Sequence, residues 1–574
     1  VMGDGVNVAS RIQSLGIANS ILFSSQINTQ IKNQQEFKSI SVGKFEFKNV
    51  EEPMEVFALA NEGFIVPKKE ELSGKLKEIR KRSARSKWII SLLAGILITV
   101  SYFIYQQVYA VSGFSGEKTI AVLPFENVGS DNSEEYISDG IAQDIINNLG
   151  RVSSLKRVVG WLSVRSFKKT TKSLKQIAEE LGVVAILSGT IQKQEGKTHI
   201  NAELIEANTN KRIWGDGFDY EGKDILSIQS KVAEEIVTAL KANVTSEEKK
   251  NLFKQYTENV EAYKLYRKGR WFGDKRTTAS YDTAILNYNK AIELDPDFAL
   301  AYVGLAELYT LPQNGMLQVE GMPMAKEYVR KALSLDSNLS EALTTLGFIQ
   351  SAYDYDWVKS KQTLEKAIAL NPNYSIAHRY YGNLLQYTGE STELGLQEIK
   401  KALKLDPLSS ADNWVLGRNY YFAGKIDSAY EQLKKTVALD PANIRAKGTL
   451  ALVLLVKKKY SEAFDIIRQL PESGTSNTIF YRGAFLSYAY AVSGDTTRAY
   501  IELNKTIKEF PDQSPYFLAI DYINLKDYDE GFTLLEKAYK IRDIGMYFLK
   551  AEPELNSIRN DIRFKALLKK MNLE

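Results

Sequence analysis

The stretch ALKLDPLSSADNWVLGRNYYFAGKIDSAYEQLKKTVALDP, residues 402–441, decides the fold of the larger part of the chain. It contains two copies of one tripeptide, Leu405-Asp-Pro407 and Leu439-Asp-Pro441. Related tripeptides stand at 294–296, 335–337 and 370–372. Successive copies are 41, 35, 35 and 34 residues apart. Between them, Gly417 and Ala429 are small enough for two helices to approach closely, and each proline stops a helix. A period near 34 predicts stacked helix pairs.

This pattern is similar to the tetratricopeptide repeat. We expect an all-α superhelix of about eight helix pairs over residues 260–541, followed by capping helices over 542–574. The resemblance implies a protein or peptide partner on the concave face. Aromatic residues that could line this face are Tyr380, Tyr381, Trp414, Tyr420 and Tyr421. Packing between helices accounts for most such aromatics, so the role of each one stays open.

Composition excludes several classes of site. The 574 residues are too many for one core and predict three or four domains. The chain has no cysteine, which excludes disulfides and thiolate metal sites, and its two histidines, His199 and His378, are far apart in sequence. A net charge of +4 is small for this length and argues against a nucleic-acid partner.

Residues 117–245 alternate strand and helix signals and predict an α/β domain. Strands are expected at 183–192, 198–207 and 211–220, and helices at 136–149, 174–181 and 225–240. The segments Ala121-Val-Leu-Pro-Phe125, Ser188-Gly-Thr190 and Arg212-Ile-Trp214 resemble the TolB-like amino-terminal domain found in tetratricopeptide-bearing regulators. That resemblance carries no catalytic residues.

A long apolar run predicts a membrane span. Residues 88–110 read WIISLLAGILITVSYFIYQQVYA, without a charge, and ~1.5 Å per residue suffices for a bilayer of ~30 Å. A basic juxtamembrane linker, residues 66–87, precedes it. The positive-inside rule then predicts a single-pass protein of the inner membrane, with its amino-terminal part cytoplasmic and its carboxyl-terminal part periplasmic.

Two motifs near the start suggest catalysis. Residues 3–11 fit the pattern Gly-x-x-Val-Asn-x-Ala-x-Arg, and residues 43–57 read as a closing β-hairpin. Together they resemble the C-terminal part of a class III adenylate or guanylate cyclase domain, an α+β fragment over residues 1–65. The resemblance implies that Asn7 orients the nucleotide ribose and that Arg11 stabilises the charge developing on the α-phosphate. A spacing of four residues puts both side chains on one helix face.

The same resemblance implies ATP or GTP as substrate, with cyclic nucleotide and pyrophosphate as products. It implies a homodimer and Mg²⁺ or Mn²⁺ as cofactor, whose aspartate ligands are expected upstream of this chain. The choice between adenine and guanine is expected just ahead of Val1.

Three functions stay open from the sequence. We expect a membrane-bound nucleotidyl cyclase in signal transduction, with an exported sensor or partner-binding region. The alternative is a non-catalytic receptor or scaffold whose repeats bind a protein. A DNA-binding regulator ranks last, because acidic residues between 36 and 55 offset the lysines of the first 60 residues.

Overall fold

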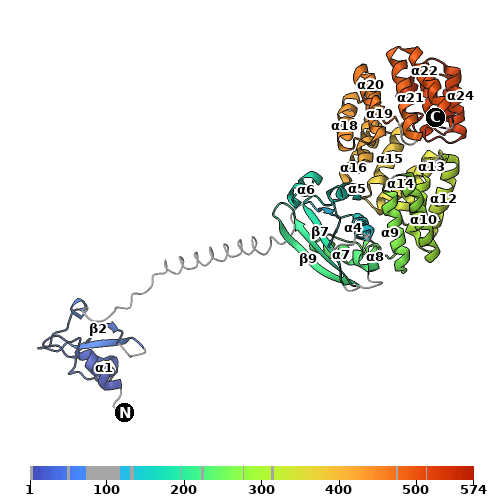
Figure 1. The fold of residues 1–574 in the computed structure, drawn as a ribbon. Coiled ribbons are helices and arrows are strands. Elements are labelled where there is room, and N and C mark those ends of the chain that lie inside the picture. Colours follow the sequence, from blue (N-terminus) through green and yellow to red (C-terminus); the bar gives the residue numbers. More distant parts are fainter. Residues whose placement is uncertain are drawn as a thin grey trace. The chain divides into compact units, whose positions relative to one another are not determined.

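Figure 1 shows the chain as a computed structural model, in which residues 4–47, 52–72, 117–128, 135–194, 197–220, 225–275, 277–311, 316–472, 476–511 and 513–574 are described. The chain forms two compact units, residues 1–111 and residues 112–574. Each unit has its own hydrophobic core.

The first unit is a small α+β arrangement. Its elements are α1 (Asp4–Gln13), β1 (Leu22–Ser24), α2 (Ser25–Ile31), β2 (Ser39–Phe45), β3 (Met54–Leu59) and the 3-10 helix η1 (Lys69–Leu72). Strand β3 lies between β1 and β2, and both pairings are antiparallel. The register slips between Ser41 and Gly43, where Gly43 has a φ of 127° that favours glycine. The hairpin expected at 43–57 is therefore present, with a bulge on its first strand.

The second unit begins with a mixed six-stranded sheet in the order β6-β4-β7-β8-β9, with β5 also paired to β7. The strands are β4 (Thr119–Val122), β5 (Glu126–Asn127), β6 (Arg157–Val158), β7 (Ala185–Gln194), β8 (Lys197–Glu206) and β9 (Lys211–Tyr220). Strands β4, β5, β6 and β7 pair in parallel, whereas β7, β8 and β9 form an antiparallel meander. The helices are α4 (Glu135–Gly150), α5 (Trp161–Val164), α6 (Leu174–Leu181), α7 (Ile225–Ala239) and α8 (Ser246–Leu252), with the 3-10 turn η4 (Arg165–Phe167).

Strand β7 begins two residues later than the sequence predicts. Helix α6 ends on Gly182 in the left-handed conformation, and the backbone N–H of Val183 donates to the carbonyl of Ala178. This closing turn uses the donor that a strand would need, so pairing with β4 starts only at Ala185.

The repeats follow as eight consecutive helix pairs within the described residues. They are α9 (Val260–Gly273) with α10 (Thr278–Leu294), α11 (Ala299–Tyr309) with α12 (Gln318–Leu335), α13 (Ser340–Ala352) with α14 (Trp357–Leu370), α15 (Ser375–Tyr387) with α16 (Thr392–Leu405), α17 (Ser410–Phe422) with α18 (Ile426–Leu439), α19 (Ile444–Val456) with α20 (Tyr460–Arg468), α21 (Ser476–Ser493) with α22 (Thr496–Glu509), and α23 (Pro515–Asn524) with α24 (Tyr528–Lys540). The predicted tetratricopeptide superhelix is confirmed, and the chain is mostly helical with a smaller sheet region.

Small residues set the distance between paired helices. A Cβ added to Gly382 on α15 would lie 2.6 Å from the backbone oxygen of Gly395 on α16, and one added to Gly417 would lie 2.7 Å from Leu433. These contacts leave no room for a side chain, which explains glycine at these positions.

The end of the chain packs back on the middle of the array. Segments η6 (Ile544–Phe548), η7 (Pro553–Ile558) and α25 (Ile562–Lys570) share one core with α13, α14 and α15. The indole N–H of Trp357 donates to the carbonyl of Met571 at 2.7 Å, and the Asn572 amide donates to the carbonyl of Tyr355 at 3.1 Å. The repeats from α13 onward are therefore closed into a ring by the C-terminal segments.

The membrane localisation predicted from the sequence is corrected. In the part of the chain that the structure describes, no helix is both long enough and apolar enough to cross a bilayer. The span expected at 88–110 and most of its basic linker lie outside the described residues.

Candidate functional site

The predicted catalytic pair lies on helix α1. Asn7 and Arg11 are one helical turn apart, and the Arg11 side chain is half-buried. Ile12 and Leu15, at and just after the end of the same helix, enter the core beside Val42 and Val56 of the hairpin. The helix is therefore fixed against the sheet by its apolar face. The roles of Asn7 and Arg11 stay predictions.

The described residues hold no group of three or more histidine, cysteine, aspartate or glutamate side chains that could bind a metal ion. The predicted Mg²⁺ or Mn²⁺, whose aspartate ligands are expected upstream of this chain, stays a prediction.

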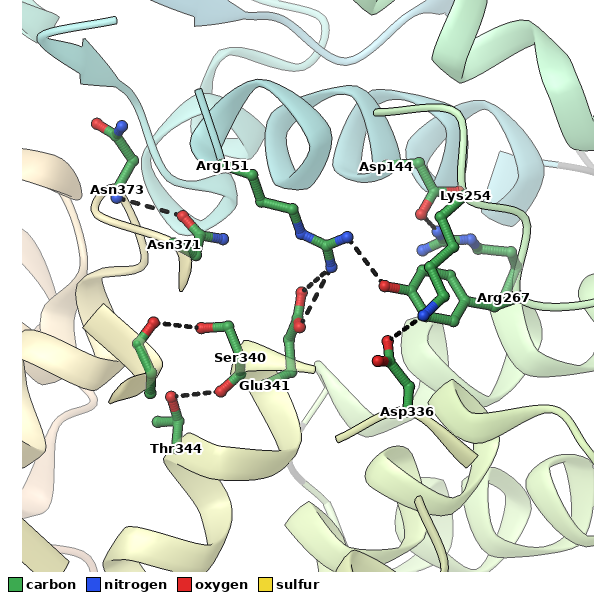
Figure 2. Close-up of polar contacts among 12 residues, drawn as sticks. Asp144, Arg151, Lys254, Arg267, Asp336, Ser340, Glu341, Thr344, Asn371 and Asn373 are labelled. Atoms are coloured by element: carbon green, nitrogen blue, oxygen red, sulfur yellow. Dashed lines mark hydrogen bonds and ion pairs between the residues drawn. The ribbon is translucent and has the colours of Figure 1, made fainter. Parts of the chain in front are cut away.

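The turns between successive helix pairs of the repeats contact the part of the second unit that holds the sheet, residues 117–252, here called the sheet region. This contact was not predicted from the sequence. Figure 2 shows Arg151, at the end of α4, reaching Glu341 in the first turn of α13. Its Nη2 lies 3.2 Å from Glu341 Oε1, and its Nη1 donates to the Tyr256 hydroxyl at 2.9 Å. Both charged side chains are 9% exposed. Burial is the largest single influence and lowers the pKa of Arg151, but Glu341 and the Tyr256 hydroxyl together outweigh it, so the pKa lies above its ordinary value.

The next turn along the array, between α14 and α15, contributes the side-chain amide of Asn373 to the contact with the sheet region. Asn373 accepts from the backbone N–H of Val158 at 3.0 Å, and its Nδ2 donates to the carbonyl of Gly150 at 3.2 Å. A third contact, to the carbonyl of Leu155, is 3.4 Å long. One buried side chain from the repeats thus satisfies three backbone groups of the sheet region.

The following turn, between α16 and α17, contributes the carboxylate of Asp406 to the same contact. Asp406 accepts a hydrogen bond from the Ser163 hydroxyl, whose oxygen in turn accepts from the Leu408 N–H at 2.8 Å. The N–H of Gly160 donates to the carbonyl of Leu405 at 2.9 Å, and a Cβ on Gly160 would lie 2.5 Å from Asp406 Oδ2. Burial, and next the nearby Asp412, raise the pKa of Asp406 to about 7.

These contacts follow the repeat period. Asp336, which binds Lys254 at 2.8 Å, and Asp406 are the middle residues of two repeat tripeptides. Asn373 directly follows the tripeptide between them, whose middle residue Asn371 accepts from the Asn373 N–H at 3.2 Å. Sequence inspection assigns these positions to helix termination, so their second role, in holding the sheet region, was missed. The signal was the polar middle residue of each tripeptide.

The ring of repeats encloses a chamber of about 280 Å³. Its wall is built by the first helices of six successive pairs, from α13 to α23, together with η6 and η7. Phe348 of α13 stacks on Tyr380 at 4.7 Å between ring centres and meets Tyr547 of η6 edge-on at 5.9 Å. This aromatic contact joins the two ends of the wall.

The chamber opens toward the sheet region. Trp414, Ile444, Arg445 and Tyr481 line both the chamber and a larger hollow of about 600 Å³. The hollow is also lined by Leu162 and Arg165 from α5 and η4. The sheet region therefore borders the entrance.

The predicted aromatic residues divide into two sets. Tyr380, Trp414 and Tyr421 line the chamber. In contrast, the Tyr381 hydroxyl donates to Glu365 at 2.8 Å, and Tyr420 lies beneath Lys400, whose Nζ is 5.7 Å from the ring centre. Part of the concave face is thus a cavity walled by aromatic side chains, and it opens at the entrance lined by Trp414 and Arg445.

Protein-family models match parts of both regions of the second unit. The models "TPR repeat" and "Tetratricopeptide repeat" match residues 280–311 and 415–477. The model of the second domain of HilA/YgeH-like transcriptional regulators matches residues 116–235. The TolB-like resemblance of this region stays a prediction.

Two curated proteins are similar in sequence to this chain over about half of its length. Putative adenylate cyclase 3 of Rhizobium meliloti is 26% identical over 306 residues, which cover 53% of this chain and 46% of that protein. Transcriptional regulator HilA of Salmonella typhimurium is 23% identical over 320 residues, covering 54% of this chain and 55% of that protein. The chain therefore spans about half the length of these relatives.

Among solved structures, yeast Tom70 is 18% identical, with a TM-score of 0.36 over 55% of this chain and 68% of that one. A tetratricopeptide repeat protein from Parabacteroides merdae is 17% identical, with a TM-score of 0.32 over 46% of this chain and 98% of that one.

Proposed function

We propose that this chain belongs to a class III nucleotidyl cyclase, in which residues 1–65 complete the catalytic domain and residues 117–574 bind a protein partner. The observation that carries the proposal is the Asn7–Arg11 pair on one helix that packs on a bulged antiparallel hairpin. The likeness to a putative adenylate cyclase supports it. The substrate would be ATP or GTP, and the product a cyclic nucleotide.

The two residues would act in different ways. Asn7 would hold the ribose so that its 3′-oxygen faces the α-phosphate, which lowers the entropy cost of the attack. Arg11 would place a permanent cation where negative charge grows on the α-phosphate oxygens. Because class III sites form between two catalytic domains, a homodimer is part of this proposal.

The test is a cyclase assay on the complete gene product, with ATP and with GTP. Replacing Arg11 by Ala is expected to slow turnover by ~10³-fold or more, as for other arginines that stabilise phosphoryl transfer. Lys32→Ala is the matched control, because Lys32 is an exposed cation after α2 in the same unit. Loss of a positive charge there is expected to leave the rate unchanged. Equal rates for Arg11→Ala and the parent would overturn the assignment.

A non-catalytic scaffold is the second candidate. The confirmed repeats favour it, because tetratricopeptide arrays bind protein partners without doing chemistry. Complete absence of cyclase activity in the parent protein, with partner binding retained, would select this candidate. The likeness to HilA does not favour DNA binding by the first unit, since the single basic residue of α1 is Arg11.

A further inference from the structure

The chamber inside the ring holds charged side chains that helix packing does not require. Arg418 on α17 is 7% exposed. Its guanidinium carbon lies 4.4 Å from the ring centre of Trp414 and 4.5 Å from that of Phe548. Its Nη2 donates to the Tyr387 hydroxyl, whereas its Nε has no hydrogen-bond partner among the described residues. A cation is thus held between two aromatic faces.

Three carboxyl groups line the same chamber. Asp521 is 1% exposed, and Glu552 and Glu554 are each 6% exposed. The Tyr421 hydroxyl donates to Glu554 Oε1 at 2.6 Å, and the Tyr516 hydroxyl donates to Glu552 at 3.2 Å. Two carboxyl oxygens, Asp521 Oδ2 and Glu554 Oε2, have no hydrogen-bond partner within the described part of the chain.

The cations of the wall do not balance these three carboxyl groups. Arg379 already pairs with Asp412 at 2.8 Å, and Arg445 is exposed at the entrance. Among the described residues of the interior, Arg418 is therefore the one cation without a carboxylate partner within ion-pair distance. Ionising all three carboxyl groups would bury uncompensated negative charge, which is costly in a space walled by aromatic rings.

We propose that the chamber binds a small organic amine, an ammonium group on a flat apolar body the size of one aromatic ring. The ammonium supplies three N–H donors, for which the carboxyl groups of Asp521, Glu552 and Glu554 in the chamber wall are the acceptors. The aromatic wall favours a cation as well as a flat apolar group. A volume of about 280 Å³ is sufficient for such a molecule but not for a folded peptide segment.

This site is independent of the proposed catalysis, because it uses none of residues 1–65. Its entrance passes Trp414 and Arg445, beside Leu162 and Arg165 of the sheet region. A ligand enters where the repeats and the sheet region meet.

The test is isothermal titration calorimetry of the whole chain with three probes of one shape. These are 2-phenylethylamine, 2-phenylethanol and 3-phenylpropanoate, which differ in the charge of the head group. The amine is expected to bind at least about tenfold more tightly than the alcohol, since a hydrogen bond to a charged group exceeds a neutral one by about that factor. The carboxylate is expected to bind most weakly.

Variants connect the preference to the chamber. Asp521→Asn and Glu554→Gln keep the side-chain size and are each expected to weaken amine binding about tenfold while leaving alcohol binding unchanged. Glu530→Gln, at an exposed carboxylate of α24, is the matched control and should change nothing. Ala484→Leu, which fills the chamber, should abolish binding of all three probes. Thermal unfolding of each variant confirms that it is folded.

Several outcomes would overturn the proposal. Equal affinity for amine and alcohol would mean an apolar hole without charge recognition. Tighter binding of the carboxylate would make Arg418 the recognising group. Absence of binding by the amine at 10 mM, or equal weakening by Glu530→Gln and Asp521→Asn, would remove the site altogether.

Discussion

Replacing Asp144 by alanine is expected to loosen the junction between the sheet region and the first repeat. Asp144 lies on α4 and forms an ion pair with Arg267 on α9. The Tyr263 hydroxyl donates to its second oxygen at 2.7 Å. The Arg267 side chain is 2% exposed, and it lies so close to Gly140 that a Cβ there would be 2.4 Å from its Cδ. The guanidinium therefore cannot turn toward water when its partner is removed.

The magnitude follows from this confinement. Removing one partner of a buried ion pair costs about 3–5 kcal/mol, because the other charge stays buried without compensation. The Tyr263 hydroxyl loses its acceptor at the same time, but the two losses share one carboxylate and do not add fully. We expect a loss of about 4 kcal/mol in the free energy of unfolding. Urea denaturation followed by tryptophan fluorescence, with hydrogen exchange of α4 and α9, measures it.

Two comparisons make the result decisive. Glu261 on α9 pairs with Lys264 at 3.8 Å on the surface, and Glu261→Ala is expected to cost less than ~1 kcal/mol. The double variant Asp144→Leu with Arg267→Met removes both charges and is expected to regain most of the loss. If Asp144→Ala costs no more than Glu261→Ala, or if the double variant is as unstable as the single one, the buried pair does not stabilise the junction.

Two further predictions concern helix spacing and a surface histidine. Gly382→Ala is expected to destabilise the repeats by about 1–3 kcal/mol, because its Cβ would lie 2.6 Å from the backbone oxygen of Gly395. Gly273→Ala is the control, since the nearest atom to its Cβ is 3.6 Å away, and it should be neutral or stabilising. Thermal unfolding of both variants measures the difference. The hydrogen bond that His199 Nδ1 donates to Asp219 Oδ1, at 2.6 Å, raises the pKa of the imidazole, so its contribution to stability is present below the unfolded pKa of ~6.5 and is lost as pH rises through the folded value. Asp219→Asn should lower this pKa in an NMR titration, and an unchanged titration would contradict the assignment.

The helical array could be predicted because its signals are local and repeated. Each unit carries its own stop at the Leu-Asp-Pro tripeptide and its own small residues where helices touch, so the helix pairs follow from the sequence alone. The strand pattern of residues 183–220 was equally local, and the differences are confined to the ends of β7 and β8. One such end was displaced by the turn around Gly182, which depends on hydrogen bonds and not on apolar pattern.

The docking and the chamber could not be predicted for the same physical reason. Asn373 and Val158 are separated by 215 residues, and Trp357 and Met571 by 214. No periodicity relates such positions, because the period describes contacts between neighbouring repeats only. The repeat pattern does not distinguish the polar residues of the chamber either. Arg418, for example, lies on the first helix of a pair, where the pattern predicts only packing between helices.

The boundary drawn in the sequence between an α/β domain and a repeat domain is not a boundary in the fold. Tyr263 of the first repeat helix belongs to the same core as Ile141 and Ile145 of α4, and Leu408 of a later turn packs against that core. A chain ending near residue 245 would therefore expose part of its apolar core together with the carbonyl of Gly150 and the N–H of Val158, which Asn373 satisfies in the whole chain. Buried polar contacts depend on direction as well as distance, so they fix one orientation of the sheet region on the repeats, which apolar contacts alone would leave free to slide. A movement at the chamber entrance would consequently move the sheet region with it as one body.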